Sequence, residues 1–157
     1  DDPYGTSFYP TFKGRDGART PMPWQSDVAG AGFTEAPRPW LPIGEAHGAL
    51  PVDRQDRDRE SLLTFARRFI AWRGAQPALR IGSARVLTLP EPIFAIERHC
   101  REQGIIAVFN LGKAPVKLPR ADLPAFVPFD HINMSVQVEG DDLHLGAHGF
   151  LFGVLTA

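Results

Sequence analysis

Three charged side chains stand close together in the segment GRDGARTPMPW, residues 14–24: Arg15, Asp16 and Arg19. An arginine keeps its positive charge and presents several donors in a planar fork, so it can hold two neighbouring hydroxyl oxygens or a carboxylate. The glycines and prolines around these charges disfavour a regular helix or strand. The segment is therefore predicted to be a stiff, irregular loop that carries two arginines.

Residue types alone leave two interpretations of this loop open. In the first, Arg15, Asp16 and Arg19 satisfy one another and the loop carbonyls, and so fix a turn that binds nothing. In the second, an arginine is one of the few convergent polar groups of a small-molecule pocket.

The composition narrows the class of protein. The chain has 157 residues, of which 43% are hydrophobic and 22% are charged, as in ordinary globular domains. A formal net charge of −1 gives no electrostatic support for binding nucleic acid or an anionic membrane, and no apolar run approaches the length of a membrane span. Cys100 is the only cysteine, which excludes an intramolecular disulfide and favours a reducing compartment. We expect a cytoplasmic protein, with the periplasm as the alternative.

The first 56 residues show no sustained period of 3.6 or 2. A structureless stretch of this length is uncommon in a compact domain and is usually functional or disordered. Disorder is disfavoured because the stretch is rich in aromatic residues: Tyr4, Phe8, Tyr9, Phe12, Trp24, Phe33 and Trp40. We predict an ordered layer of loops that packs against something. Because the chain begins in what reads as the middle of a loop, we also expect a fragment of a longer protein.

A helix is predicted over residues 60–73. Asp58 is the expected N-cap, and Glu60 complements the positive end of the helix dipole. Gly74 ends the helix, and Pro77 is expected to prevent it from resuming. Apolar residues recur at steps of three and four and form one stripe: Leu62, Phe65, Ala66, Phe69, Ile70 and Trp72.

Short strands are predicted after Gly82. Several strands at short, regular spacing are typical of an antiparallel sandwich or barrel. We therefore expect six to eight strands within residues 83–157, packed against the helix of residues 60–73. The expected strands are ARVLTL, IFAIER, IIAVFNL, PVKL, MSVQV, LHL and FLFGVL.

Two features of this region resemble metal ligands. Asp141 and Asp142 follow Gly140, which is more typical of a hairpin turn than of a metal site. His144 and His148 lie four residues apart in strand-like sequence, so they do not share a helix face as ligands. We predict no metal site and no cofactor.

The order and spacing of four elements resemble a known family. GRDGARTPMPW, AGFT, PWLPI and VDRQDRDRESLLTFARRFIAWRGAQPAL occur in that order between residues 14 and 79. The pattern resembles the exo-acting α-glucosidases of the α-amylase superfamily, a group that includes oligo-1,6-glucosidases, maltose-type α-glucosidases, sucrose isomerases and trehalose synthases. After Arg80 the resemblance rests only on the position of a β-rich tail.

The resemblance implies an α+β fragment. Residues 1–80 would be the end of a (β/α)8 barrel, with the loop after strand 8 up to about residue 56, followed by helix 8. The apolar stripe of that helix would face the barrel sheet. Residues 81–157 would be a C-terminal antiparallel β-sandwich domain. Active sites of such barrels lie among the loops at the C-terminal ends of the strands, so the arginine loop would be one wall of a sugar pocket.

The resemblance also assigns a role to Arg19. In the family, the arginine of the RTPM element lies at the closed end of the glucose pocket, pairs with an aspartate from an early barrel loop and contacts the non-reducing sugar. Arg15 and Asp16 match the GRD part, which we interpret as loop scaffolding. Aromatic residues such as Trp24, Phe33 and Trp40 are more often the core of a loop layer than platforms for a sugar, and we assign them no role.

The catalytic groups of the family have no counterpart here. A retaining glycosidase needs two carboxyl groups about 5 Å apart, and the family's three catalytic carboxylates precede the residues that this sequence matches. We therefore assign no catalytic residue and expect the chain to be inert by itself. Its implied partners are an α-glucoside or small oligosaccharide and the remainder of the barrel. We also expect the fragment to self-associate through its exposed aromatic residues, or to be disordered across parts of residues 1–56.

Two functions follow. The chain is either a portion of a retaining α-glucosidase, supplying a pocket wall and a stabilising β-domain, or a stand-alone, non-catalytic β-sandwich that binds carbohydrate or protein. A coding sequence upstream with the three carboxylates would favour the first. We prefer the first, because a pocket loop without its barrel would expose aromatic surface to no purpose.

Overall fold

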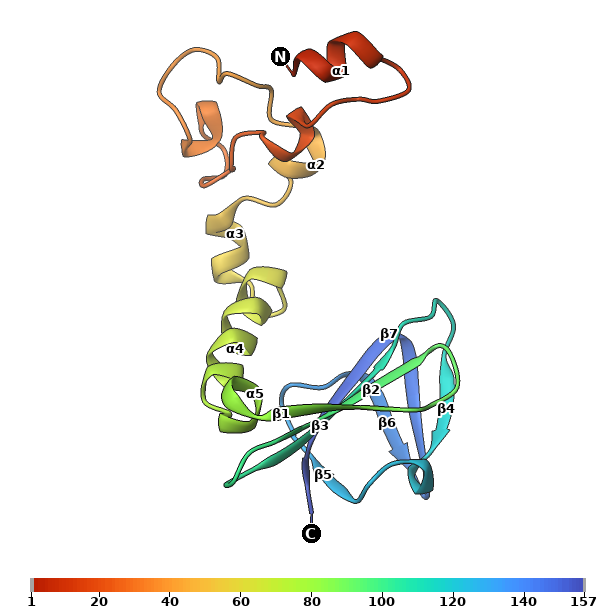
Figure 1. Ribbon diagram of the computed structural model, residues 1–157. Coiled ribbons are helices and arrows are strands. Elements are labelled where there is room, and N and C mark those ends of the chain that lie inside the picture. The colour runs from red at the N-terminus through yellow and green to blue at the C-terminus, as the bar shows by residue number, and fades with distance from the viewer. Residues whose placement is uncertain (1, 157) are drawn as a thin grey trace. The chain divides into compact units, whose positions relative to one another are not determined.

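The computed structural model describes residues 2–156. Contacts between residues group the chain into two compact units, 1–68 and 69–157 (Figure 1). The division falls within a helix, because the last turns of that helix pack against the sheet of the second unit. This division is not the domain boundary predicted near residue 80, which marks the end of the catalytic barrel and stays a prediction.

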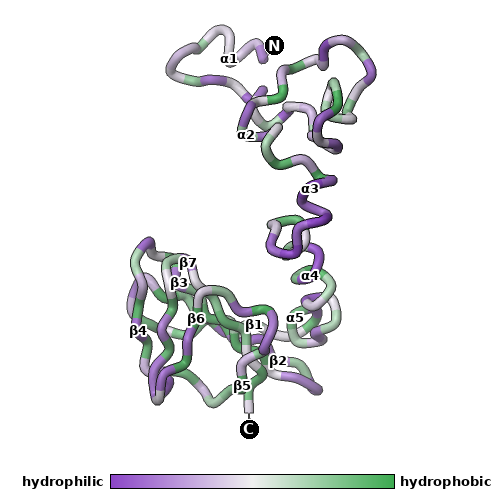
Figure 2. The backbone as a smooth tube through the Cα atoms, turned by 180° about the vertical axis from the view of Figure 1, so that it is seen from behind, coloured by the Kyte–Doolittle hydropathy of each residue, from purple (hydrophilic) through white to green (hydrophobic). Residues whose placement is uncertain are grey.

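The first unit contains short helices where no period was visible in the sequence. They are α1 (Pro3–Phe8), α2 (Glu45–Gly48) and α3 (Val52–Arg57), with 3-10 turns at Asp16–Ala18 and Ala29–Gly32. Each helix has six residues or fewer, and such lengths are too short to display an amphipathic period. Figure 2 shows the hydrophilic character of α3 against the more hydrophobic strands of the second unit.

The predicted helix is confirmed as α4 (Leu62–Gly74), but its predicted N-cap is wrong. The Ser61 hydroxyl oxygen accepts a hydrogen bond from the N–H of Thr64 at 3.2 Å, which is the contact of an N-cap side chain. The Asp58 carboxylate instead accepts the N–H of Glu60 at 2.9 Å, in the turn ahead of the helix. The helix therefore begins later than predicted, at a serine.

The apolar stripe of α4 is only partly covered. Trp72 is buried, whereas Leu62 and Ile70 are 76% and 68% exposed. A second helix, α5 (Pro77–Ile81), follows at once. The helix α4 ends at Gly74 and does not resume, as expected, but Pro77 begins a new helix, because proline fits the first turn of a helix, where no N–H partner is needed.

Seven antiparallel strands follow within the described residues, which agrees with the six to eight predicted. They are β1 (Ser83–Leu87), β2 (Ile93–His99), β3 (Gly104–Asn110), β4 (Val116–Pro119), β5 (Phe126–Pro128), β6 (Met134–Glu139) and β7 (Asp142–Leu155). The three-residue β5 was not predicted. The two segments LHL and FLFGVL, predicted as separate strands, are parts of β7.

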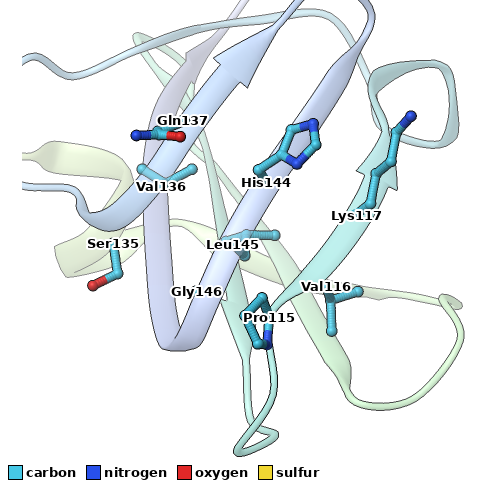
Figure 3. A pocket seen from close by; sticks show the side chains of 9 residues that line it. All are labelled: Pro115, Val116, Lys117, Ser135, Val136, Gln137, His144, Leu145 and Gly146. Atoms are coloured by element: carbon cyan, nitrogen blue, oxygen red, sulfur yellow. The ribbon is translucent and has the colours of Figure 1, made fainter.

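The strand β7 organises the whole sheet. Its first part lies between β4 and β6, and its last part lies between β3 and β5. Between these parts the chain bends sharply near Gly146 (Figure 3), and His148 has a φ of 55°. A side chain at Gly149 would approach the Ser135 carbonyl oxygen to 2.5 Å. The two layers of the predicted sandwich are therefore one continuous, folded sheet that turns at glycines.

Each face of this sheet has its own core. Trp72 of α4 packs edge-on against Phe129 and Phe152, with ring centroids 5.0 Å away in both cases. The predicted packing of the helix against the β-domain is thus confirmed for the last turns of α4. This face buries Trp72, Ala78, Leu79, Ile105, Ala107, Ile132 and Phe152. The opposite face buries Ile93, Ala95, Ile106, Val108, Leu118, Leu123, Phe126, Leu143, Leu145 and Leu151.

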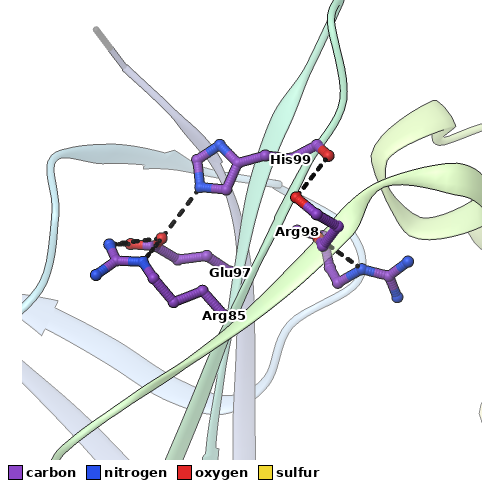
Figure 4. A network of polar contacts seen from close by, with 5 residues as sticks. Arg85, Glu97, Arg98 and His99 are labelled. Carbon is purple, nitrogen blue, oxygen red and sulfur yellow. Dashed lines mark hydrogen bonds and ion pairs between the residues drawn. The ribbon is translucent and has the colours of Figure 1, made fainter.

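A buried carboxylate joins the edge strand β1 to β2. Arg85 lies directly opposite Glu97 and donates two hydrogen bonds of 2.8 Å to its carboxylate (Figure 4). The His99 Nε2 lies 3.0 Å from the same carboxylate. Burial alone would raise the pKa of Glu97, but the bonds to His99 and Arg85 outweigh it and hold this pKa below its ordinary value. This network therefore stabilises the ionised form of a side chain that is 2% exposed.

Candidate functional site: the arginine loop

Arg19 ends the 3-10 turn Asp16–Ala18. Its N–H donates to the Asp16 carbonyl oxygen at 3.0 Å, which closes the turn. Its side chain is exposed, and among residues 2–156 its guanidinium has no hydrogen-bond or ion-pair partner. The donors of this fork are therefore free to bind a ligand or another carboxylate.

The side chain of Arg15, unlike that of Arg19, is bound within this unit. Its backbone N–H and its Nε both donate to Oδ2 of Asp2, at 2.8 and 3.1 Å. Its guanidinium also lies 5.9 Å from the ring centroid of Tyr4. Asp16 accepts the N–H of Asp2 on its Oδ2 at 3.0 Å. Arg15 and Asp16 therefore tie the loop to the segment before it, as the scaffolding interpretation predicted.

Asp2 is the buried centre of these contacts. It is 2% exposed, caps α1 by accepting the N–H of Tyr4 at 3.1 Å, and pairs with Arg15. The side-chain and backbone hydrogen bonds from Arg15 lower the pKa of Asp2 from 3.8 to about 2. Gly14 allows the two segments to touch, because a side chain there would lie 2.9 Å from the Cα of Gly5.

This lowered pKa predicts an acid-sensitive loop. Because the pKa of Asp2 is lower in the folded chain, its carboxylate stabilises the fold above about pH 4, and this contribution is lost as the pH falls from 3.8 towards 2. The melting temperature of wild type minus that of Asp2→Asn should therefore shrink over this interval. Melting curves of both chains from pH 7 to pH 2 test this, and a constant difference would contradict it.

The other side of the loop is held by Asp53, at the start of α3. Its Oδ1 accepts the N–H of Ser26 at 2.9 Å and its Oδ2 accepts the Ser26 hydroxyl at 2.8 Å. The Ser26 hydroxyl bond lowers the pKa of Asp53. Two backbone bonds lie beside this contact: the N–H groups of Val52 and Asp53 donate to the carbonyls of Pro23 and Trp24 at 2.9 and 3.1 Å.

A small open pocket of about 260 Å³ is lined in part by residues that are near Arg19 in the sequence. At its edge the Thr20 hydroxyl and Nδ1 of His47 are 3.1 Å apart, which links the residue after Arg19 to α2. The pocket is lined by Gly17, Thr20, Pro21, Met22, Pro23, His47 and Leu50. It provides a mainly apolar surface on the segment that follows Arg19.

The aromatic residues of this unit are exposed rather than internal. Trp24, Phe33 and Trp40, to which the sequence assigns no role, are 50%, 44% and 58% exposed, so they do not form a core among the described residues of this unit. The physical reason is that the unit lacks a sheet or long helix to pack on. Within residues 2–68 the buried residues are Asp2, Pro21, Pro23, Leu41, Pro51 and Ser61.

A second open pocket of about 540 Å³ lies on the β-domain (Figure 3). Lys117 and His144 point from its wall, but Lys117 forms a 2.8 Å ion pair with Asp142, which raises the pKa of Lys117. His144 lies 3.5 Å from Glu139. Lys117 and His144 are therefore both engaged by carboxylates from outside the pocket lining.

The acidic pair beside this pocket lies in a hairpin. Glu139 pairs with Asp142 across a two-residue turn, and Gly140 in that turn has a φ of 58°, so the hairpin interpretation of Asp141 and Asp142 is confirmed. Across residues 2–156, no three His, Cys, Asp or Glu side chains are grouped as metal ligands. None of the helices in this part of the chain is both long and apolar enough to cross a membrane.

Solved enzyme structures share this architecture. An alpha-glucosyl transfer enzyme, XgtA, matches 99% of this chain with a TM-score of 0.88 and 38% identity, and the chain covers 29% of it. The trehalulose synthase MutB from Pseudomonas mesoacidophila MX-45 matches 98% of this chain with a TM-score of 0.74; at 23% identity it shows the fold alone, and the chain covers 30% of it. The fold of this chain is thus that of a portion of these enzymes.

Sequence relatives define the family. A probable alpha-glucosidase of Rhizobium meliloti is 35% identical over 99% of this chain, and probable oligo-1,6-glucosidase 2 of Bacillus subtilis is 34% identical over 64% of it. Residues 4–82 match the family described as alpha amylase, catalytic domain. The chain belongs to the alpha-amylase family. It spans 28% and 18% of the lengths of these two relatives.

Proposed function

We propose that this chain is part of a retaining α-glucosidase that acts on α-glucosidic bonds of small oligosaccharides. In this proposal it supplies one wall of the substrate pocket and a stabilising β-domain, while other parts of the enzyme supply the catalytic carboxylates. The match of residues 4–82 to a catalytic domain and the names of the relatives support the proposal. The placement of residues 1–80 at the end of a barrel is part of the proposal.

The observation that carries the proposal is the contrast between the two arginines. Arg15 donates its hydrogen bonds to Asp2. Arg19, four residues later, has no partner among the described residues, and the loop that carries it is held by contacts on both sides. A free, permanently charged fork on a braced loop can bind adjacent sugar hydroxyls and a carboxylate together. The apolar pocket formed in part by the residues after Arg19 suits the C–H face of a pyranose ring.

An activity assay of the isolated chain tests whether the catalytic carboxylates lie in other parts of the enzyme. We expect the purified 157-residue chain to show no turnover of a chromogenic α-glucoside, because the two carboxyl groups of a retaining mechanism lie elsewhere. The full-length enzyme assayed beside it should hydrolyse the same compound. Hydrolysis by the isolated chain that survives repurification, or none by the full-length enzyme on any α-glucoside, would contradict the proposal.

The same preparation of the isolated chain should self-associate. Its exposed aromatic and aliphatic side chains include Tyr9 at 72% and Leu62 at 76%, and apolar surface of this kind usually finds a partner. In the full-length enzyme that partner would be the remainder of the barrel. A monodisperse monomer by sedimentation would contradict this part of the proposal. A cytoplasmic location, expected from the single cysteine, is likewise proposed.

A further inference from the structure

Arg19 lies between two points at which carboxylates hold the loop. Asp2 fixes residues 15 and 16, and Asp53 fixes residues 23–26. We infer that Asp2 and Asp53 are positioning residues, which set the place of the Arg19 guanidinium in the sugar pocket. This inference rests on the proposed function and assigns to these two carboxylates a role that the sequence motifs did not indicate.

On the Asp2 side, the connection to Arg19 is an unbroken series of hydrogen bonds. Asp2 accepts both donors of Arg15 and donates its own N–H to the Asp16 carboxylate. Asp16 then begins the 3-10 turn, and its carbonyl accepts the N–H of Arg19. Arg15 directly precedes this turn and donates twice to the Asp2 carboxylate, so loss of the Asp2 charge weakens the hold on the start of the turn that carries Arg19.

On the Asp53 side, the loop is held by side chain and backbone together. Both carboxylate oxygens of Asp53 bond to Ser26, and two backbone bonds hold residues 23 and 24 next to it. Two of the residues between Arg19 and Trp24 are prolines, whose φ angles are fixed. Few torsions therefore remain free between this anchor and Arg19, so displacement at Ser26 is transmitted along the segment.

Neither carboxylate has the placement of a catalytic group. Asp2 is 2% exposed and both of its oxygens accept protein donors, and both oxygens of Asp53 are bound to Ser26. They act through Arg19, and positioning matters because a displacement of about 1 Å in a substrate-binding group can lower the rate by about a hundredfold. The His47 contact to Thr20 supports the same segment from a third side.

The experiment is a set of double-mutant cycles in the full-length enzyme. Asp2→Asn and Asp53→Asn are each made in the wild type and in Arg19→Ala, and kcat/KM is measured on one α-glucoside. The matched control is Asp27→Asn, because Asp27 forms an ion pair with Arg54 in the same unit but is 81% exposed. If the carboxylates act through Arg19, each substitution should lower kcat/KM by about tenfold or more in the wild type and by less than about twofold in Arg19→Ala. Asp27→Asn should change neither.

The outcomes separate this inference from the proposed function. If Arg19→Ala leaves kcat/KM intact, the proposed function fails, and the positioning inference fails with it. If Arg19→Ala lowers kcat/KM but the carboxylate variants lower it equally in both backgrounds, or not at all, only the positioning inference is overturned. Ser26→Ala removes one bond to Asp53 and keeps the carboxylate, so it provides the same test if Asp53→Asn does not fold.

Discussion

Replacing Arg19 by alanine in the full-length enzyme is expected to lower kcat/KM by about a hundredfold or more, because the proposed sugar contact would help to position the reacting bond. Arg19 has no partner among the described residues, so its substitution removes ligand contacts without breaking a bond within this loop. An aspartate elsewhere in the pocket would lose its counter-charge, at a cost of about 3–5 kcal/mol if that aspartate is deeply buried. Steady-state kinetics on the variant and the wild type measure the effect.

Two further variants serve as controls. Arg19→Lys keeps the charge but loses the planar fork, so it should not restore activity. Arg15→Ala should mainly lower the melting temperature, because Arg15 binds Asp2 and not a ligand. Near-normal efficiency in Arg19→Ala together with loss of activity in Arg15→Ala would show that the two arginines have been assigned the wrong way round.

Replacing Trp72 by alanine is expected to destabilise the β-domain by about 3–5 kcal/mol. Trp72 is 8% exposed and packs against Phe69, Phe129 and Phe152, so its truncation leaves a cavity between α4 and the sheet. Urea denaturation of the 157-residue chain, monitored with a probe that reports on the β-domain, measures this loss of stability.

Trp72→Phe is the matched control. Among the described residues, the indole N–H of Trp72 is buried without a hydrogen-bond partner, and an unsatisfied buried donor is unfavourable. Phenylalanine removes this donor and keeps an aromatic ring, so we expect it to cost less than half as much as alanine. An equal cost for both substitutions would show that the indole makes a specific contact beyond packing.

The sequence predicted elements wherever a periodic pattern was long enough to read. The helix over residues 60–73 and most of the strands after Gly82 were placed close to their observed bounds. The helix start was wrong, because Asp58 and Ser61 are both good capping residues and only tertiary contacts decide between them. A sandwich was predicted, but the structure has a single folded sheet. The segments LHL and FLFGVL, expected as two strands, are joined through the bend at Gly146 into the one strand β7.

The candidate site was predictable in part. The scaffolding role of Arg15 and Asp16 followed from the motif and is confirmed by their bonds to Asp2. Asp2 and Asp53 were missed because each binds a segment 13 to 27 residues away, and separation of that size leaves no local pattern. The sequence DP at the start of α1 was the one available signal, since an aspartate before proline is typical of a helix N-cap.

The central place of β7 dictates the order in which the β-domain can assemble. Its partners β3, β4, β5 and β6 all precede it in the chain. During synthesis, β3, β4, β5 and β6 are therefore all made before β7, the strand with which each of them pairs. Pairings of this kind between distant segments form slowly and expose aggregation-prone edges in the meantime. A stop codon before β7 would leave β4, β5 and β6 without their sheet partner and β3 with one open edge, whereas the loops between the earlier strands can vary in length at much lower cost.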